Sequence, residues 1–527
     1  MKHQATTVGE TALAALRRHP DRTAFSWSDG TGLSNTATYA QCLDAIGRTQ
    51  AVFASAGLVR GDGIAVLAGN TVDTWLSAMA AWCSGLRLTY LHPRGSLADH
   101  LHQLGDARAR ALVVDVAAFA DRAAEIRAAT AVEHMLALGN ADLDGPTIDL
   151  RAARKSAGAH SAADLGRVDD VLWLNYTGGT TGRPKGVAYR HASVLNQTRS
   201  ILADFELPAT PRYLAVAPIT HVAGTKILPV LHRGGTVHLM DRFTPGGVLS
   251  AIERERINMT LLVPTMVYDL LDSPELEGAD LSSLELALYG AAPMAPRRLA
   301  EAHERIGRVF AQLYGQSECY PISYLARAEH VGEDPDVLAS CGFPVHAAQV
   351  RLLDESGADV PADEPGEICV RSASVMSEYW EQPEQTEAAL AGGWLHTGDI
   401  GRVDDRGLIR IVDRKKDLVV TGGFNVFPRE VEDVLASHPD VGAVAVYGLP
   451  DEHWGEAVTA TVVLRAGATA TADDLRSWVR GRKGGLHTPK QVFVVDGLPM
   501  TAVGKIDKKS LRDGPVDRGA SRARHQF

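Results

Sequence analysis

The feature that most constrains the fold is an alternation of short apolar runs with longer helical segments. Residues 63–69 (GIAVLAG), 111–115 (ALVVD) and 171–177 (VLWLNYT) have strand character, whereas 41–56 and 74–84 carry the Ala, Leu and Arg periodicity of helices. Strands that alternate with helices pair in parallel and are covered by those helices. The sequence therefore predicts an α/β fold built on parallel sheets.

The length indicates more than one domain. At 527 residues the chain exceeds the size at which a single hydrophobic core usually stops growing. Pro428 can begin a helix, and residues 443–448 and 457–464 predict strands near the C-terminus. We predict a large N-terminal body of several subdomains over 1–413 and a small, mobile α+β domain over 414–527. The tail from about residue 514 is polar and basic, and it is expected to be flexible.

Charge and cysteine content argue against several classes of binding partner and of stabilising site. The formal net charge of −11 gives no broad basic footprint for nucleic acid or anionic lipid. The five cysteines are scattered and never form a CxxC spacing, so the sequence suggests neither a disulfide framework nor a zinc site. No apolar run reaches the roughly 18 residues of a spanning helix, and no signal peptide is evident. We expect a cytoplasmic protein, and the sequence leaves a homodimer possible.

The most informative stretch is YTGGTTGRPKGV, residues 176–187, which directly follows an apolar strand. Small residues let successive backbone N–H groups approach an anion, threonine hydroxyls add donors, and Lys185 adds positive charge. The stretch is not a Walker loop, because GxxxxGK[ST] is not satisfied. It predicts a phosphate-binding loop, with a mobile surface loop as the alternative.

This stretch resembles the TSGTTGxPKG signature of the adenylate-forming superfamily, and the chain is most similar to its acyl- and aryl-CoA ligase branch. Further motifs of that superfamily follow in the same order and cover almost the whole chain. They are Pro218–His221, Gly290–Pro293, Tyr314–Glu318, Thr397–Asp399, Asp413–Asp417, Gly422–Gly423 and Pro499–Lys505.

The resemblance implies an AMP-forming acid-thiol ligase. ATP would activate a hydrophobic carboxylic acid as an acyl-adenylate, and the acyl group would pass to CoA. Lys505 would bridge the substrate carboxylate and the α-phosphate, because two anions must be brought into contact. Glu318 would hold Mg²⁺, since carboxylate oxygens suit this ion. His221 would separate the acid pocket from the thiol tunnel.

The resemblance also assigns the remaining site residues. The C-terminal domain would rotate about Lys416 between an adenylating and a thioester-forming pose. Gly422 and Gly423 would line the CoA tunnel. ATP and AMP would contact Thr177, Gly178, Gly179, Thr180, Thr181, Gly182, Lys185, Gly290, Ala291, Ala292, Tyr314, Gly315, Ser317, Asp399, Arg414 and Lys505. The acid would contact His221, Val222, Met266, Ala291 and Gly315.

Two positions depart from the usual pattern. Gly179 stands where the loop commonly has Ser, and Ser317 stands where the later motif commonly has Thr. Ser317 keeps its hydroxyl, but Gly179 loses one donor to developing charge, which can cost about 2.7–4 kcal/mol in a tight site. We therefore hypothesise that adenylation is weaker here than thioester formation, unless backbone donors and the neighbouring threonines compensate.

Two alternatives to a CoA ligase stay open, and a third is disfavoured. The acyl group could load a carrier protein in place of CoA, or the fold could bind nucleotide without turnover. Amino-acid activation is disfavoured, because no acidic residue occurs between Pro218 and Gly235 to pair with a substrate ammonium. The expected partners are a small hydrophobic acid or its adenylate and CoA. The sequence does not decide whether the acid is fatty, aryl or polycyclic.

Overall fold

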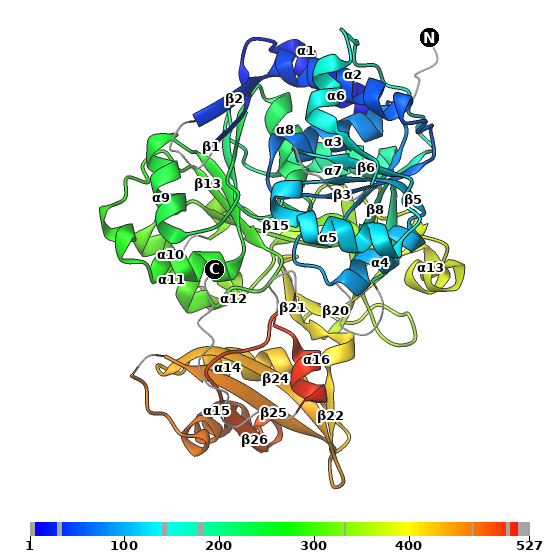
Figure 1. Ribbon diagram of the computed structural model, residues 1–527. Helices are drawn as coiled ribbons and strands as arrows, with labels where there is room; N and C mark the ends of the chain where they lie inside the picture. Colours follow the sequence, from blue (N-terminus) through cyan, green and yellow to red (C-terminus); the bar gives the residue numbers. More distant parts are fainter. Residues whose placement is uncertain are drawn as a thin grey trace.

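The computed structural model describes residues 6–514 except 29–33, 140–144, 178–183, 331–333, 466 and 502–505. It shows a large body, blue to yellow in Figure 1, above a smaller C-terminal domain drawn in orange and red. The predicted α/β fold class is confirmed. The boundary at 413/414 and the mobility of the small domain stay predictions.

An eight-stranded sheet and a nine-stranded sheet form most of the body. Both are parallel in the centre; the eight-stranded sheet is antiparallel at one edge and the nine-stranded sheet at both. The first has the order β19 (Glu378–Tyr379), β9 (Gly186–Arg190), β8 (Val171–Tyr176), β4 (Arg87–Tyr90), β3 (Gly63–Leu67), β5 (Ala109–Val114), β6 (His134–Ala137), β7 (Thr147–Asp149). The second has the order β16 (Phe343–Pro344), β15 (Cys319–Leu325), β14 (Phe310–Gln316), β13 (Leu286–Gly290), β12 (Met259–Leu262), β10 (Arg212–Ala215), β11 (Thr236–Leu239), β1 (Thr23–Ser28), β2 (Ser34–Thr38).

Helices cover these sheets in layers, as expected for parallel strands with two buried faces. One core joins both sheets and contains Leu150 together with residues of α1 (Val8–Arg18), α2 (Tyr39–Ser55), α3 (Val72–Cys83), α7 (His191–Asp204) and α8 (Ile227–His232). A second core packs against the nine-stranded sheet, beneath α9 (Pro245–Arg254), α10 (Pro264–Leu271), α11 (Pro296–Arg305) and α12 (Pro335–Leu338). A third packs the eight-stranded sheet against α4 (Leu97–Asp106) and α5 (Val116–Ala129). Two short helices, α6 (Leu150–Ser156) and α13 (Pro383–Ala389), complete the body.

A four-stranded antiparallel sheet links the body to the small domain. Its order is β17 (Ala348–Leu353), β18 (Gly366–Ser372), β20 (Leu395–Val403), β21 (Ile409–Arg414). The backbone N–H of Gly407 donates to the Asp404 carbonyl over 2.9 Å in the turn between β20 and β21, as the sequence predicts. Because β21 ends at Arg414, this sheet brings the end of the body next to the start of the small domain.

The C-terminal domain has its own sheet and its own apolar core. The strands are β22 (Val419–Thr421), β23 (Phe424–Val426), β24 (Val441–Asp451), β25 (Gly455–Leu464) and β26 (Gln491–Val494), and the helices are α14 (Pro428–Ala436), α15 (Ala472–His487) and α16 (Lys508–Asp513). Val431 and Leu435 of α14 are fully buried against the sheet. The predicted helix start at Pro428 and both predicted strands are therefore confirmed.

Candidate active site

The candidate site lies where the central parallel strands end. β8 ends at Tyr176 before the Gly/Thr-rich stretch, β13 ends at Gly290, and β14 ends at Gln316, directly before Ser317 and Glu318. Ligands of parallel α/β sheets bind outside the carboxyl ends of the strands. The topology thus brings several of the motifs to one edge of the body, although they are far apart in the sequence.

Asp399 joins three of these motifs. Its carboxylate is 4% exposed and accepts a hydrogen bond from the Tyr314 hydroxyl over 2.7 Å. Arg414, its cross-strand neighbour on β21, brings Nε to 3.2 Å from the other carboxylate oxygen. Burial and then the Asp399 carboxylate raise the pKa of Tyr314 far above its usual value, so Tyr314 donates at all physiological pH values.

Tyr379 connects the glycine-rich stretch to the predicted metal ligand. Its hydroxyl donates to Glu318 Oε1 over 2.7 Å, and Lys185 Nζ lies 4.9 Å from the centre of its ring. The backbone N–H of Met376 donates to the Glu318 carbonyl over 2.7 Å, which fixes the main chain at the same point. Lys185 and Glu318 therefore face a common aromatic ring, and their side chains are only half-buried.

Gly290 ends β13, and Ala291 directly follows it. Ala291 has a φ of 65°, a left-handed conformation that is uncommon for a residue with a side chain. A Cβ atom on Gly290 would lie 2.4 Å from the Leu313 carbonyl oxygen on the neighbouring strand. Close strand pairing therefore requires glycine at this position, whatever ligand lies beyond it.

His221 lies in a largely dehydrated environment. Its ring meets the ring of His92 edge-on at 4.8 Å, and its Nδ1 is 2.9 Å from the Thr220 hydroxyl. Burial lowers the pKa of His221 to about 4, and burial and then His221 lower the pKa of His92 to about 3. Both rings are uncharged at neutral pH, which suits a pocket for an apolar acyl group.

Lys226 is a buried lysine that the sequence analysis missed. It is 0% exposed, and its Nζ donates to the Val222 carbonyl over 3.2 Å, the Thr225 hydroxyl over 2.8 Å and the Tyr320 hydroxyl over 2.5 Å. Burial lowers its pKa well below the usual value. It thereby ties the segment holding His221 and Val222 to β15. A lone lysine in the apolar run TKILPVL was the available signal.

The two predicted tunnel glycines have a local structural role. Gly422 and Gly423 have φ values of 58° and 80° and form a two-residue turn between the paired Thr421 and Phe424. Such hairpin turns require positive φ at both positions. A Cβ on Gly422 would also lie 2.9 Å from the Trp454 ring. The turn accounts for both glycines, and their tunnel role stays a prediction.

Several predicted site residues lie outside the described residues: Gly178, Gly179, Thr180, Thr181, Gly182 and Lys505. Thr177 is described, and its backbone N–H donates to the Lys185 carbonyl over 3.0 Å, which closes the base of the glycine-rich stretch. Burial lowers the pKa of Lys416, the predicted hinge. Met266 of α10 packs against the two cores that meet the nine-stranded sheet.

Comparison with known proteins agrees with this arrangement. Residues 13–380 match the AMP-binding enzyme family, and residues 430–505 match the AMP-binding enzyme C-terminal domain. The chain belongs to the AMP-binding enzyme family. The predicted family resemblance is therefore confirmed.

Curated relatives of this AMP-binding enzyme cover nearly its full length. It is 43% identical over 518 residues to the medium/long-chain-fatty-acid–CoA ligase FadD8 of Mycobacterium tuberculosis, covering 96% of this chain and 89% of the relative. It is 36% identical to a feruloyl-CoA synthase of an Amycolatopsis species, covering 96% and 98%. The predicted AMP-forming acyl-CoA ligase activity is confirmed at this level.

Solved structures show the same fold. The amide bond synthetase McbA from Marinactinospora thermotolerans is 33% identical with a TM-score of 0.87, covering 95% of this chain and 99% of that one. ATP-bound MatB from Rhodopseudomonas palustris is 28% identical with a TM-score of 0.86, covering 96% and 99%. Among the described residues, no helix has the length and apolar character needed to cross a membrane.

Proposed function

We propose that this acyl-CoA ligase acts on a medium- or long-chain aliphatic acid, with aromatic acids as the second choice. The nucleotide-dependent part of this proposal rests on one observation: Tyr314, Asp399 and Arg414 meet beside the strand ends. Their contact places a buried carboxylate where it could accept hydrogen bonds from nucleotide hydroxyls. The preference for an aliphatic acid is supported by FadD8, whose identity to this chain is 43% against 36% for the feruloyl-CoA synthase.

The residues divide between two half-reactions. Asp399 and Arg414 would bind the ribose, Tyr314 and the backbone at Gly290–Ala292 would hold adenine, and Lys185 with the glycine-rich stretch would contact the phosphates. Lys505 would bridge the acid and the α-phosphate in the first half-reaction. Gly422 and Gly423 would approach CoA in the second, after rotation about Lys416.

Glu318 fits a magnesium ligand. It offers a half-buried carboxylate whose Oε1 is oriented by Tyr379 and whose Oε2 remains a second hard oxygen donor. Mg²⁺ in nucleotide sites is often held by one or two carboxylates together with the substrate phosphates. When bound, the ion would neutralise phosphate charge. Glu318 would hold it at the end of β14.

The deciding experiment separates the half-reactions with Lys505→Ala. The variant should form AMP from ATP and acid at least ~100-fold more slowly, because it loses the cation that bridges two anions. It should still make the thioester from presynthesised acyl-adenylate and CoA within a few-fold of wild type. Lys509→Ala, at an exposed lysine of α16, is the matched control. Equal rates in both variants for the ATP-dependent step would contradict the assigned role.

The acceptor and the acid are tested together. Wild-type protein with ATP, Mg²⁺ and aliphatic or aromatic acids is offered CoA, a carrier protein or simple amines, and products are measured by mass spectrometry. Amines are included because McbA is an amide bond synthetase. We expect acyl-CoA to dominate; amide or acyl-carrier as the main product would overturn this. Thioester only from preformed adenylate would support the hypothesis of weak adenylation. The missing Ser hydroxyl belongs to position 178 and not to 179, because Thr177 matches the first residue of TSGTTGxPKG and Gly179 matches its first glycine.

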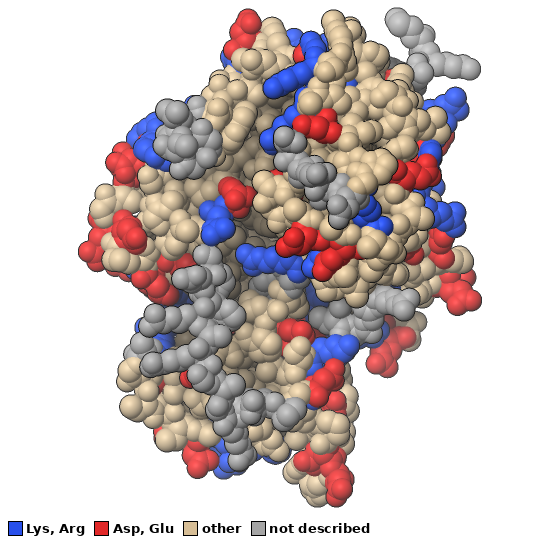
Figure 2. All heavy atoms as spheres, in the orientation of Figure 1, with Lys and Arg blue, Asp and Glu red and all other residues tan. Residues whose placement is uncertain are grey.

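Cytoplasmic location and a homodimer are further proposals that rest on the sequence. Charged side chains of both signs are interspersed on the face shown in Figure 2, so this face has no single-sign field that would favour an anionic lipid or a nucleic acid. The protein is therefore expected to act on small molecules, and gel filtration with light scattering would measure its oligomeric state.

A further inference from the structure

The four-stranded sheet brings three chemically different ligands onto one face. Cys369 of β18 lies directly opposite His396 of β20 in the ladder, and Glu367 precedes Cys369 by two residues. The ladder shifts register between Glu367 and Cys369, so regular alternation of side chains does not by itself bring these residues together. The positions of the side-chain atoms show that a carboxylate, a thiol and an imidazole do lie together.

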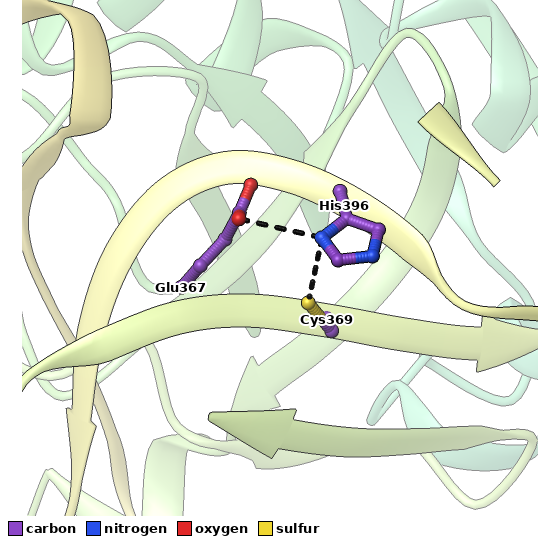
Figure 3. Close-up of side chains that lie close together, drawn as sticks. All are labelled: Glu367, Cys369 and His396. Carbon is purple, nitrogen blue, oxygen red and sulfur yellow. Dashed lines mark hydrogen bonds and ion pairs between the residues drawn. The ribbon is translucent and has the colours of Figure 1, made fainter. Parts of the chain in front are cut away.

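The three ligand atoms converge on one point. Glu367 Oε2 lies 3.3 Å from His396 Nδ1, and Cys369 Sγ lies 3.4 Å from the same nitrogen. All three ligand atoms are within 4.8 Å of one another. Figure 3 shows the carboxylate and the thiol both directed at the imidazole ring from β18.

These separations match a metal site. A tetrahedral Zn²⁺ with the usual Zn–N, Zn–O and Zn–S bond lengths places nitrogen and oxygen about 3.3 Å apart and nitrogen and sulfur about 3.5 Å apart. Both separations from His396 Nδ1 therefore already suit a tetrahedral ion, and the Glu367 oxygen and the Cys369 sulfur lie within 4.8 Å of each other. One carboxylate oxygen of Glu367 is already fixed, because the Gly398 N–H donates to Oε1 over 3.0 Å.

We propose that Glu367, Cys369 and His396 bind a soft divalent cation such as Zn²⁺, with water completing four ligands. As the metal–sulfur bond forms, the Cys369 thiol gives its proton to solvent and no electron transfer occurs. Cys369 and His396 are 27 residues apart in the sequence, so no CxxC-like spacing indicates the site.

Two cationic side chains lie near the proposed ligands and would affect their affinity for a metal ion. Arg351 is paired with Cys369 across β17 and β18, but its guanidinium is engaged by both carboxylate oxygens of Asp359. Lys415 is the direct competitor, because its Nζ lies 3.2 Å from the same Oε2 of Glu367. Its side chain is 53% exposed, so it can move into solvent when a metal binds.

Metal binding would also affect residues next to the predicted nucleotide site. Lys415 directly follows Arg414, the partner of Asp399, and His396 precedes Asp399 by three residues on β20. Displacing Lys415 from Glu367 would therefore free the residue between Arg414 and the predicted hinge Lys416.

The test uses tag-free, full-length protein and the metals themselves. Co²⁺ titration should produce a thiolate-to-cobalt charge-transfer band, and Zn²⁺ affinity is measured by competition with a chromogenic chelator. Cys369→Ser should abolish the band, and His396→Gln should weaken Zn²⁺ binding at least ~10-fold because one ligand is lost. Cys42→Ser and His346→Gln are the matched controls and should bind like wild type.

Lys415→Gln tests the proposal by a gain of Zn²⁺ affinity, which a misfolded variant would not show. Removing the competing cation should tighten Zn²⁺ binding several-fold while leaving the three ligands intact. Absence of a thiolate band in wild type, or equal Zn²⁺ affinity in wild type, Cys369→Ser and His396→Gln, would overturn the proposal. Circular dichroism of each variant identifies any that fail to fold, and such a variant is replaced by Cys369→Ala or His396→Asn.

Discussion

The hydroxyl of Tyr314 donates to the buried carboxylate of Asp399 over 2.7 Å, although the residues are 85 positions apart. The contact joins β14 of the nine-stranded sheet to β20 of the linking sheet. A nucleotide bound against Tyr314 would therefore meet a carboxylate whose position is already fixed. Such preorganisation avoids ordering costs when the ligand binds.

Tyr314→Phe should weaken ATP binding. A hydrogen bond to a charged group contributes about 1.5–3 kcal/mol. Because the protein makes this bond before ATP binds, only the part that positions Asp399 affects binding, and we expect the KM for ATP to rise by up to roughly tenfold. Tyr289→Phe is the matched control, because Tyr289 is also buried but its hydroxyl contacts His330 and not Asp399. Steady-state kinetics measure both, and an unchanged KM for ATP in Tyr314→Phe would contradict the role of this contact.

Glu318→Gln should impair magnesium-dependent adenylation. The substitution keeps the size of the side chain but removes its charge, so the Mg²⁺ concentration for half-maximal rate should rise and kcat should fall by about 100-fold. Glu378→Gln, at a half-buried residue 3.4 Å from Arg190, is the control. Pyrophosphate exchange at several Mg²⁺ concentrations measures the effect, and parallel responses of the two variants would rule out a metal role.

Lys226→Met should change the pH dependence of stability. Burial lowers the folded-state pKa of Lys226, so between that pKa and the ordinary value near 10.4 the unfolded chain binds more protons than the native state. The free energy of unfolding should then rise with pH from the lowered pKa up to about pH 10, by at most about 1.4 kcal/mol per unit. Urea unfolding of Lys226→Met should show a smaller slope, whereas the control Lys509→Met should keep the wild-type slope. Equal slopes in all three proteins would mean that Lys226 remains charged.

Asp413 should make the free energy of unfolding fall, not rise, as the pH increases in the acidic range. Burial raises its pKa to about 6, so the native state keeps a proton that the unfolded chain loses above about pH 4. This contribution to stability is present below about pH 4 and is lost as the pH rises to about 6. Asp413→Asn should flatten that change in urea unfolding, and the exposed control Asp405→Asn should not. If both variants kept the wild-type dependence of unfolding free energy on pH, the raised pKa of Asp413 would be contradicted.

The sequence alone determined much of the fold. The strand runs at 63–69, 111–115 and 171–177 correspond to β3, β5 and β8, because their apolar residues are buried on both faces of a parallel sheet. The ordered motifs also located Tyr314, Glu318, Asp399 and Arg414. The helix start at Pro428 was equally visible, whereas Gly422 and Gly423 were expected to line the CoA tunnel and only the structure showed their two-residue turn.

Only the tertiary structure decided which distant side chains meet. Tyr379 orients Glu318, Lys226 joins the His221 segment to Tyr320, and Cys369 faces His396, yet no spacing in the chain links these pairs. Hydrophobic periodicity specifies which face of an element is buried, but strand order and register specify which polar groups share that face. The scattered cysteines argued against a zinc site in sequence, whereas pairing of β18 with β20 brings one of them to a histidine and a carboxylate.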